Sequence, residues 1–422
     1  MNLQQSAPLK SGGGSTLGID TKSLHRGQPK KRDRSALGDK QMRYSLQRMA
    51  QGLLFDHEAD KQKRVCNCCR STNGGKVDVF RTVDRENARL GGVIKCGSVW
   101  HCPVCSGVIT EERRGEVQAG LNAWTKQGGS TYLMTLTFPH RIEQSLAEVL
   151  PLYAKAEQRF KNSKAYKAAR ELGEWAGTIR GLEVTFGQNG WHPHTHVLIF
   201  GHDGMLDDNR TIDALQSAWI SALIKTGLAE NSQLNDMMRH AFDLQGGDYA
   251  AEYIAKFGHE PKLVSTWGAA REVTKGHSKI GMSNIGGNNH ATPFMLLAWA
   301  EQGDREAGAR FIEYAEAFEG RRMLTWSPGL KTRLLNTDDE RTDEEIAAAE
   351  SMPDEELVAT LDGEQWKLVL SRNARGELLL FAAKNGAEGV AALLEDLAER
   401  PATHSGKHWT KRIFGGGFAA CH

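Results

Sequence analysis

The 422-residue chain has no apolar run of about 18 residues, which excludes a membrane-spanning helix and a membrane partner. It also lacks an apolar signal segment at its start, so we expect a cytoplasmic protein in a reducing compartment. No internal repeat is present. The formal net charge is only +1, so the total charge does not mark a nucleic-acid binder. The function must therefore be sought in local patterns.

Composition divides the chain into five parts. Residues 1–60 begin Gly/Ser-rich and basic, which predicts a mostly disordered arm that contacts phosphates or is simply solvated. Residues 336–358 are strongly acidic and indicate a linker or a solvated helix. Between them we expect a cysteine-bearing subdomain over 61–110 and a main domain over 111–335. Residues 359–422 form a small module whose basic, aromatic tail leaves DNA contact and dimerisation both open.

The periodicity of the sequence predicts mixed α and β structure. Helices are expected over 108–127, 143–173, 209–227 and 291–319, and strands over 131–138, 177–187 and 192–200. A few antiparallel strands with helices packed on one face form an α+β sandwich. In the C-terminal module we expect a hairpin over 366–383, turned around 373–376, and a short helix over 390–400.

Three histidines, His192, His194 and His196, occupy alternate positions of one expected strand. Because successive side chains on a strand point to opposite faces, all three imidazoles project from the same face. Few packed cores accommodate such a row. The histidines are therefore candidates for a site on a sheet surface.

An acidic residue is expected to join the histidines across a hairpin. Asn189-Gly190 is a strong signal for a two-residue turn between the two strands. If these two residues form the turn, Glu183 lies directly opposite His196, with Cβ atoms about 5 Å apart. A carboxylate and two or three imidazoles then converge on one point.

Such a group is typical of a divalent-metal site. The histidines could also be exposed or hydrogen-bonded fillers. A zinc hydrolase with an HxHxD(H) motif is a competitor, but Leu198 stands where that motif requires an acid. Imidazole and carboxylate ligands with open positions suit Mg²⁺ or Mn²⁺ acting on phosphate about as well as Zn²⁺.

Residues 248–257, DYAAEYIAKF, predict a helix in which Tyr249, Tyr253 and Phe257 share one face. Lys256 follows Tyr253 by three residues, where its charge would stabilise a phenolate and contact a phosphate. A tyrosine beside a lysine is a usable nucleophile. The aromatic stripe alone is more typical of a buried helix face.

Two CxxC motifs flank a β-rich segment and predict a structural zinc site of four thiolates. The expected ligands are Cys66, Cys69, Cys102 and Cys105. The alternative, a pair of disulfides, requires an oxidising compartment. Three further groups leave the ligand set open, namely Cys68, Cys96 and His101.

The order of these features resembles the HUH endonuclease superfamily. An apolar strand (131–138), the HPHTH strand and the YxxK helix are most similar to the plasmid rolling-circle replication initiators. Residues 291–297 (ATPFMLL) and 324–330 (LTWSPGL) resemble that family's later blocks. The resemblance covers about residues 64–330. It implies a central antiparallel sheet with helices, here preceded by a zinc-ribbon-like subdomain.

The resemblance also implies a role for each matching residue. His194 and His196 would hold the catalytic cation, with Glu183 as a candidate third ligand. His192 is extra to this pair and could bind metal, phosphate or nothing. Tyr253 would be the nucleophile, because it alone carries a lysine three residues later.

Termination of the reaction is less determined. Some relatives use two tyrosines four residues apart, but the residue four after Tyr253 is Phe257, and Tyr249 has Glu252 at its third following position. Relatives with one tyrosine can use a glutamate to activate water. Glu252 is the nearest candidate, although it could simply pair with Lys256.

The implied activity is nicking and rejoining of plasmid origin DNA through a 5′-phosphotyrosine, with Mg²⁺ or Mn²⁺ as the catalytic metal and Zn²⁺ as the structural one. The expected partner is origin DNA, single-stranded or extruded as a hairpin at the nick. Host helicase and polymerase are further candidates. The alternatives are an HUH transposase or relaxase, a non-catalytic zinc-ribbon DNA-binding protein, and a zinc hydrolase in which Tyr253 is idle.

Overall fold

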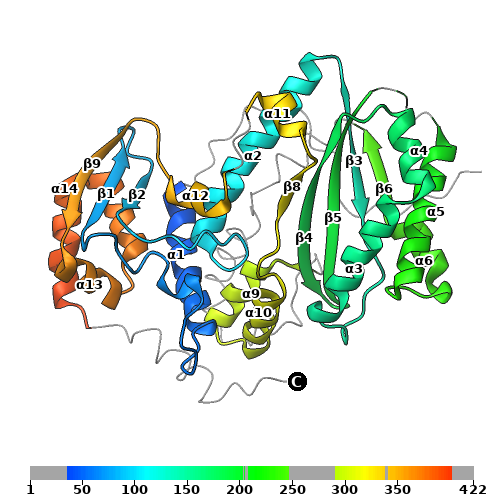
Figure 1. Cartoon of the computed structure of the whole chain (residues 1–422). Coiled ribbons are helices and arrows are strands. Elements are labelled where there is room, and N and C mark those ends of the chain that lie inside the picture. Colours follow the sequence, from blue (N-terminus) through cyan, green and yellow to red (C-terminus); the bar gives the residue numbers. More distant parts are fainter. Residues whose placement is uncertain (1–35, 203, 205–207, 247–289, 338–340, 402–422) are drawn as a thin grey trace, which may run out of the picture. The chain divides into compact units, whose positions relative to one another are not determined.

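The structure is a computed structural model that describes residues 36–202, 204, 208–246, 290–337 and 341–401. The expected tyrosine helix and most of the basic arm lie outside these ranges. The α+β class is confirmed, because the described residues form antiparallel sheets and helices (Figure 1). The assignment to the HUH type stays a prediction.

The larger sheet carries the histidine strand at its centre. Its order is β6-β3-β5-β4-β7, with β8 also paired to β4, and all pairings are antiparallel. The strands are β3 (Ser130–Leu136), β4 (Gly177–Gly187), β5 (Gly190–Gly201), β6 (Phe242–Gly246), β7 (His290–Ala291) and β8 (Leu324–Trp326). The predicted hairpin is thus β4 and β5. Residues 291–297 form the end of β7 and the start of helix α9 (Pro293–Glu301), and residues 324–330 begin with β8.

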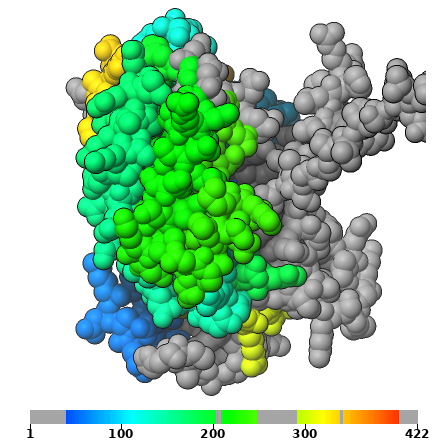
Figure 2. Space-filling model, turned by 90° about the vertical axis from the view of Figure 1, so that its right-hand side faces the viewer, coloured from blue at the N-terminus to red at the C-terminus, as the bar shows by residue number. Residues whose placement is uncertain are grey.

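One face of this sheet is covered by helices that follow the strands in sequence. They are α3 (Leu146–Lys161), α4 (Lys164–Leu172), α5 (Asn209–Thr226) and α6 (Leu234–His240). Helix α3 begins with a capping box formed by Ser145 and Glu148. Tyr153 of α3 donates a hydrogen bond to the carbonyl of Leu136, and Trp219 of α5 donates one to Thr137. Helices α5 and α6 form much of the green surface in Figure 2.

Among the described residues, helices cover the opposite face at one end. There α2 (Pro103–Lys126) and α11 (Leu330–Leu335) pack on Leu198, Phe200 and Ile179 in a separate apolar cluster. Trp124 of α2 is buried in this cluster, and its indole donates to the carbonyl of Gly201. The other end of the same face carries the histidines. The sequence therefore divides one sheet face into an apolar half and a polar half.

A second, three-stranded sheet joins segments from opposite ends of the chain. Its order is β2-β1-β9, formed by β1 (Val77–Thr82), β2 (Ala88–Gly91) and β9 (Glu355–Leu361). Figure 1 shows the blue β1 beside the orange β9. Residues expected in the acidic linker and the C-terminal module therefore pair with residues of the predicted zinc-ribbon-like subdomain. The division of the chain into domains stays a prediction.

Part of the expected basic arm is a buried helix. Residues of α1 (Ala36–Leu53) include Leu46, Met49 and Ala50, each at most 1% exposed. The expectation of disorder was wrong for this segment, because an apolar face at helical spacing lies within its basic sequence. Residues 1–35 lie outside the described part.

The predicted C-terminal hairpin is also wrong. Residues 366–383 lie in α13 (Gly363–Ser371) and α14 (Arg375–Glu399), and α14 contains the short helix expected over 390–400. Asp362 caps α13 through a capping box, and buried Leu378, Leu379, Ala382 and Ala383 recur at helical spacing. The apolar residues of this run follow the helical period and not the period of two expected for strands.

The remaining described helices connect these layers. They are η2 (Arg64–Asn67), η3 (Asn231–Gln233), α9 (Pro293–Glu301), α10 (Arg305–Ala317) and α12 (Asp343–Ala348). Helix α12 lies within the acidic segment and starts with a capping box at Thr342. In the part of the chain that the structure describes, no helix has both the length and the apolar content needed to cross a membrane.

Candidate active site and metal centres

The β4–β5 hairpin brings Glu183 to the histidines, but in a register different from the predicted one. Glu183 lies opposite His194 and not opposite His196, because Gly187 pairs with Gly190 and the turn lies one residue earlier. Gly190 has φ +87, and a Cβ there would lie 2.8 Å from the Arg141 carbonyl, so it starts the strand against that loop. The register differs from the predicted one by two residues, so Glu183 still lies on the same sheet face as the histidines.

Three side chains converge on the open half of the sheet. The Nε2 atoms of His194 and His196 lie 3.2 Å and 3.8 Å from one carboxylate oxygen of Glu183. The two imidazoles are 15% and 16% exposed, whereas the Glu183 side chain is 40% exposed. These three ligand atoms lie within 4.8 Å of one another and could hold a metal ion open to solvent on one side.

The remaining ring nitrogens of both histidines have partners of their own. Nδ1 of His196 lies 3.0 Å from the Thr135 hydroxyl on β3. Nδ1 of His194 lies 3.2 Å from the carbonyl of His192. Such contacts at Nδ1 orient the rings and leave Nε2 for a cation.

The electrostatics of the two imidazoles differ. Burial acts to lower the pKa of His194, but the hydrogen bond and charge of Glu183 outweigh it and raise that pKa. Burial lowers the pKa of His196 to about 4, with Glu183 opposing only in part and His194 adding to the decrease. At neutral pH the His196 ring is therefore a neutral, available ligand.

His192 lies beside this group but is not one of its three members. Its Nε2 contacts the hydroxyl of Thr137, and its ring stacks on His140 with centroids 4.5 Å apart. Its imidazole thus already has contacts on the same face. A direct role for His192 at the metal stays a prediction.

The predicted nucleophile lies outside the described residues, as do its neighbours Lys256 and Glu252. The strands on either side of that segment are both in the larger sheet. Strand β6 pairs with β3, and β7 pairs with the end of β4 at Phe186 and Gly187. The roles of Tyr253, Lys256 and Glu252 stay predictions.

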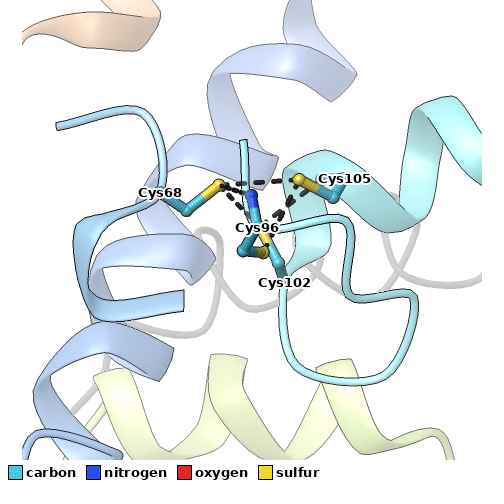
Figure 3. Close-up of side chains that lie close together, drawn as sticks. All are labelled: Cys68, Cys96, Cys102 and Cys105. Carbon is cyan, nitrogen blue, oxygen red and sulfur yellow. Dashed lines mark hydrogen bonds between the residues drawn. The ribbon is translucent and has the colours of Figure 1, made fainter. Parts of the chain in front are cut away.

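A second group of possible ligands consists of four buried thiols. Cys68, Cys96, Cys102 and Cys105 point toward a common centre in Figure 3. Cys68 Sγ lies 3.7 Å from Cys102 Sγ and 3.5 Å from Cys105 Sγ. Cys96 Sγ lies 3.7 Å from Cys105 Sγ. These are free cysteines, and their spacing could accommodate a metal ion.

This group shares only two members with the four predicted ligands. Cys66 Sγ points toward the Leu54 carbonyl at 3.6 Å, and burial raises its pKa to about 11. The sulfur of Cys69 lies 3.8 Å from the Cys68 thiol and is not one of the four converging sulfurs. His101 instead contacts the carbonyl of Ala315 at 2.7 Å. The structure therefore does not bring Cys66 and Cys69 into the group.

Cys96 lies outside both CxxC motifs, but the residues that follow it direct its sulfur into the group. Cys96 is followed by Gly97, whose φ of +66 turns the next amide, that of Ser98, toward the Cys96 sulfur at 3.5 Å. The amide of Cys105 donates to Cys102 Sγ at 3.4 Å in the same way. Burial acts to raise the pKa of Cys102, but hydrogen bonds from three neighbouring thiols hold it well below its ordinary value.

Comparison with known proteins gives two relatives and a family. The chain is 28% identical over 380 aligned residues to a protein named Protein rep from Streptomyces lividans, covering 73% of this chain and 79% of that protein. It is 32% identical over 133 residues to a protein named Neomycin resistance protein from Streptomyces cyanogenus, covering 26% of this chain and 30% of that protein. No solved structure gives a significant match.

A family match covers the described sites. Residues 88–368 match the family described as Rep_1, replication protein, and this range includes the histidine strand and three of the four converging cysteines. The match spans more than half of the chain. This chain therefore belongs to the Rep_1 family of replication proteins.

Proposed function

We propose that this protein initiates rolling-circle replication of a plasmid by nicking and rejoining one strand of the origin. The observation that carries the proposal is the convergence of Glu183, His194 and His196 on the open half of the sheet. Membership of the replication protein family supports the same conclusion. The proposed substrate is origin DNA that is single-stranded or extruded as a hairpin at the nick.

The donor set fits a catalytic divalent cation. Two imidazole nitrogens and one carboxylate oxygen face a common point, and Glu183 is open to solvent. Bound Mg²⁺ or Mn²⁺ would polarise a non-bridging oxygen of the scissile phosphate. The Thr135 hydroxyl would keep the His196 ring oriented during this contact.

The covalent step is assigned to Tyr253. Its phenolate oxygen would attack phosphorus in line, forming the tyrosine–phosphate bond as the bond to the 3′ oxygen breaks. That oxygen leaves and takes up a proton, giving a free 3′-OH that can prime a polymerase. The 5′-phosphotyrosine retains the energy of the broken ester, so the strand can be rejoined later.

Chain connectivity permits this assignment. Strand register places Gly246 two strands across and three residues along from His196, a separation of about 14 Å. Tyr253 follows Gly246 by seven residues, which span at most about 25 Å when extended and about 15 Å when residues 248–253 are helical as expected. The nucleophile is therefore within reach of the cation site.

Two neighbours of the tyrosine complete the proposed reaction. Lys256 would stabilise the phenolate and contact the phosphate. At the end of the reaction the phosphotyrosine bond must be broken. Glu252 would activate a water molecule for this step, or the 3′-OH of a DNA strand would attack the phosphorus and release the tyrosine. A helicase and a polymerase of the host are the proposed partners that use the nicked origin.

We also propose that the four converging thiols hold a structural Zn²⁺. A Zn–S distance of about 2.3 Å places the sulfurs of a tetrahedral site about 3.8 Å apart. The sulfur–sulfur distances Cys68–Cys102, Cys68–Cys105 and Cys96–Cys105, 3.5 to 3.7 Å, agree with that geometry. All four side chains are buried, as in closed structural zinc sites.

The test is a nicking assay on labelled single-stranded origin DNA with Mn²⁺ or Mg²⁺. After denaturation we expect labelled DNA on the protein, absent in Tyr253→Phe and in His194→Ala. Thr178→Val, a half-buried position on the opposite face of β4, is the control and should retain the adduct. Metal-dependent cleavage without an adduct would instead indicate a hydrolase, and an adduct on Tyr249 would reverse the nucleophile assignment.

A further inference from the structure

Arg375, at the start of α14, is a buried cation with no acidic partner among the described residues. The residue is 2% exposed. Its Nη1 donates hydrogen bonds to Gln47 Oε1 at 2.7 Å and to the Cys69 carbonyl at 3.0 Å, and its guanidinium lies over the Tyr44 ring. Within the ranges that the structure describes, no carboxylate forms an ion pair with it. All of its contacts are neutral groups.

A buried guanidinium without a nearby anion destabilises the folded protein, because its charge has lost its hydration. The neighbourhood increases this destabilisation, because the positive charges of Arg48 and Arg70 act on the same region. The buried charge of Lys95 is compensated, since its ammonium forms an ion pair with Glu350 at 2.7 Å. The charge of Arg375 therefore requires another source of negative charge.

The negative charge can come from the cysteine group, which Arg375 reaches through the side chain of Gln47. Gln47 is fully buried, and its amide bridges two groups. The Oε1 atom accepts from Arg375, while Nε2 donates to Cys102 Sγ at 3.1 Å. An N–H donor directed at a sulfur stabilises thiolate more than thiol. The amide thus connects the guanidinium to the group of four cysteines.

We propose that Arg375 is the counter-charge of a zinc tetrathiolate and that Gln47 positions it. This inference rests on the zinc proposal: four thiolates around Zn²⁺ carry a net charge of −2, and Arg375 offsets half of it from the outer shell. Helix α14 is the carrier of that charge. Zinc binding and the docking of residues 375–399 are therefore coupled.

The experiment measures zinc affinity of the full chain by competition with a chromophoric chelator. Arg375→Met keeps the bulk and removes the charge, and should lower the affinity about 10- to 100-fold. Arg375→Lys should recover part of the loss. The matched control is Arg372→Met, because Arg372 bonds to Ser371 and Leu397 and not to the cysteine region. It should leave zinc affinity unchanged even where it lowers stability.

A second measurement needs no substitution. Hydrogen exchange of the wild-type protein before and after zinc chelation should show a loss of protection in α14 along with the cysteine loops. Unchanged protection of α14, or wild-type zinc affinity in Arg375→Met, overturns the coupling and leaves the zinc site standing. Wild-type protein purified without zinc overturns both. Neither result bears on the nicking assay, whose readout is the DNA adduct.

Discussion

Proton competition at the histidine site predicts how cation binding depends on pH. Glu183 raises the pKa of His194 above that of an ordinary histidine, so a proton competes with the cation for this ring up to a higher pH. The pKa of His196 is lowered to about 4, so that ring carries no proton to displace. Below the pKa of His194, each bound cation must therefore release one proton. The affinity should fall tenfold, or about 1.4 kcal/mol, for each pH unit.

The substitution Glu183→Gln separates the two effects. It leaves the burial that lowers the pKa of His194 and removes the carboxylate that raises it. The pH dependence should therefore move to lower pH. At high pH the affinity should also be weaker, because the charged ligand is lost.

Mn²⁺ binding followed by electron paramagnetic resonance from about pH 5 to pH 8 measures both changes. The expected slope is one proton per cation in the wild-type protein, with a lower midpoint in Glu183→Gln. A slope of two protons, a hundredfold per pH unit, would show that His196 also titrates. A midpoint unmoved by Glu183→Gln would refute the role given to that carboxylate.

Three further predictions concern stability and the thiols. Glu157→Gln removes a buried charge that holds the half-buried guanidinium of Arg180 through two hydrogen bonds. It should lower the free energy of unfolding by about 3 kcal/mol in a denaturant titration. A loss near zero would contradict the assignment. Phe160→Ala empties a fully buried site and should cost about 3–5 kcal/mol in the same assay. Cys96→Ser should abolish zinc retention measured by metal analysis, whereas Cys66→Ser should retain it, and the reverse outcome would restore the ligand set expected from the motifs.

Strand alternation explains why the site could be predicted from sequence although the register could not. A shift of two residues exchanges the partner of Glu183 but keeps its face, so the acid meets the imidazoles in either register. The position of the turn depended on the contact of Gly190 with the Arg141 loop, which no local pattern contains. The face on which a side chain lies follows from the local sequence, whereas the register of this hairpin depends on a tertiary contact.

The cysteine ligands required tertiary information of the same kind. Both CxxC motifs are present, but the backbone at Cys69 takes a positive φ of 53, and the Cys68 sulfur is the one directed at the other thiols. Cys96 joins through the turn at Gly97. The spacing of the motifs predicted that four thiols lie near one point. Which four thiols these are depends on the fold.

The C-terminal helices show the limit of periodicity in short apolar runs. Residues 366–383 contain enough apolar positions to fit either a strand pair or a helix. The structure selects helices because α14 packs on β1, β2 and β9, a sheet that exists only when distant segments pair. Asn373, expected in a hairpin turn, instead has φ 55 between the two helices.

The most direct test of the central claim is an anomalous difference map from crystals of this protein grown with Mn²⁺. We expect a peak in contact with Nε2 of His194, Nε2 of His196 and a carboxylate oxygen of Glu183. A well-ordered sheet with no peak at these atoms, and with manganese bound elsewhere, would contradict the assignment of this face as the site where the DNA strand is cut.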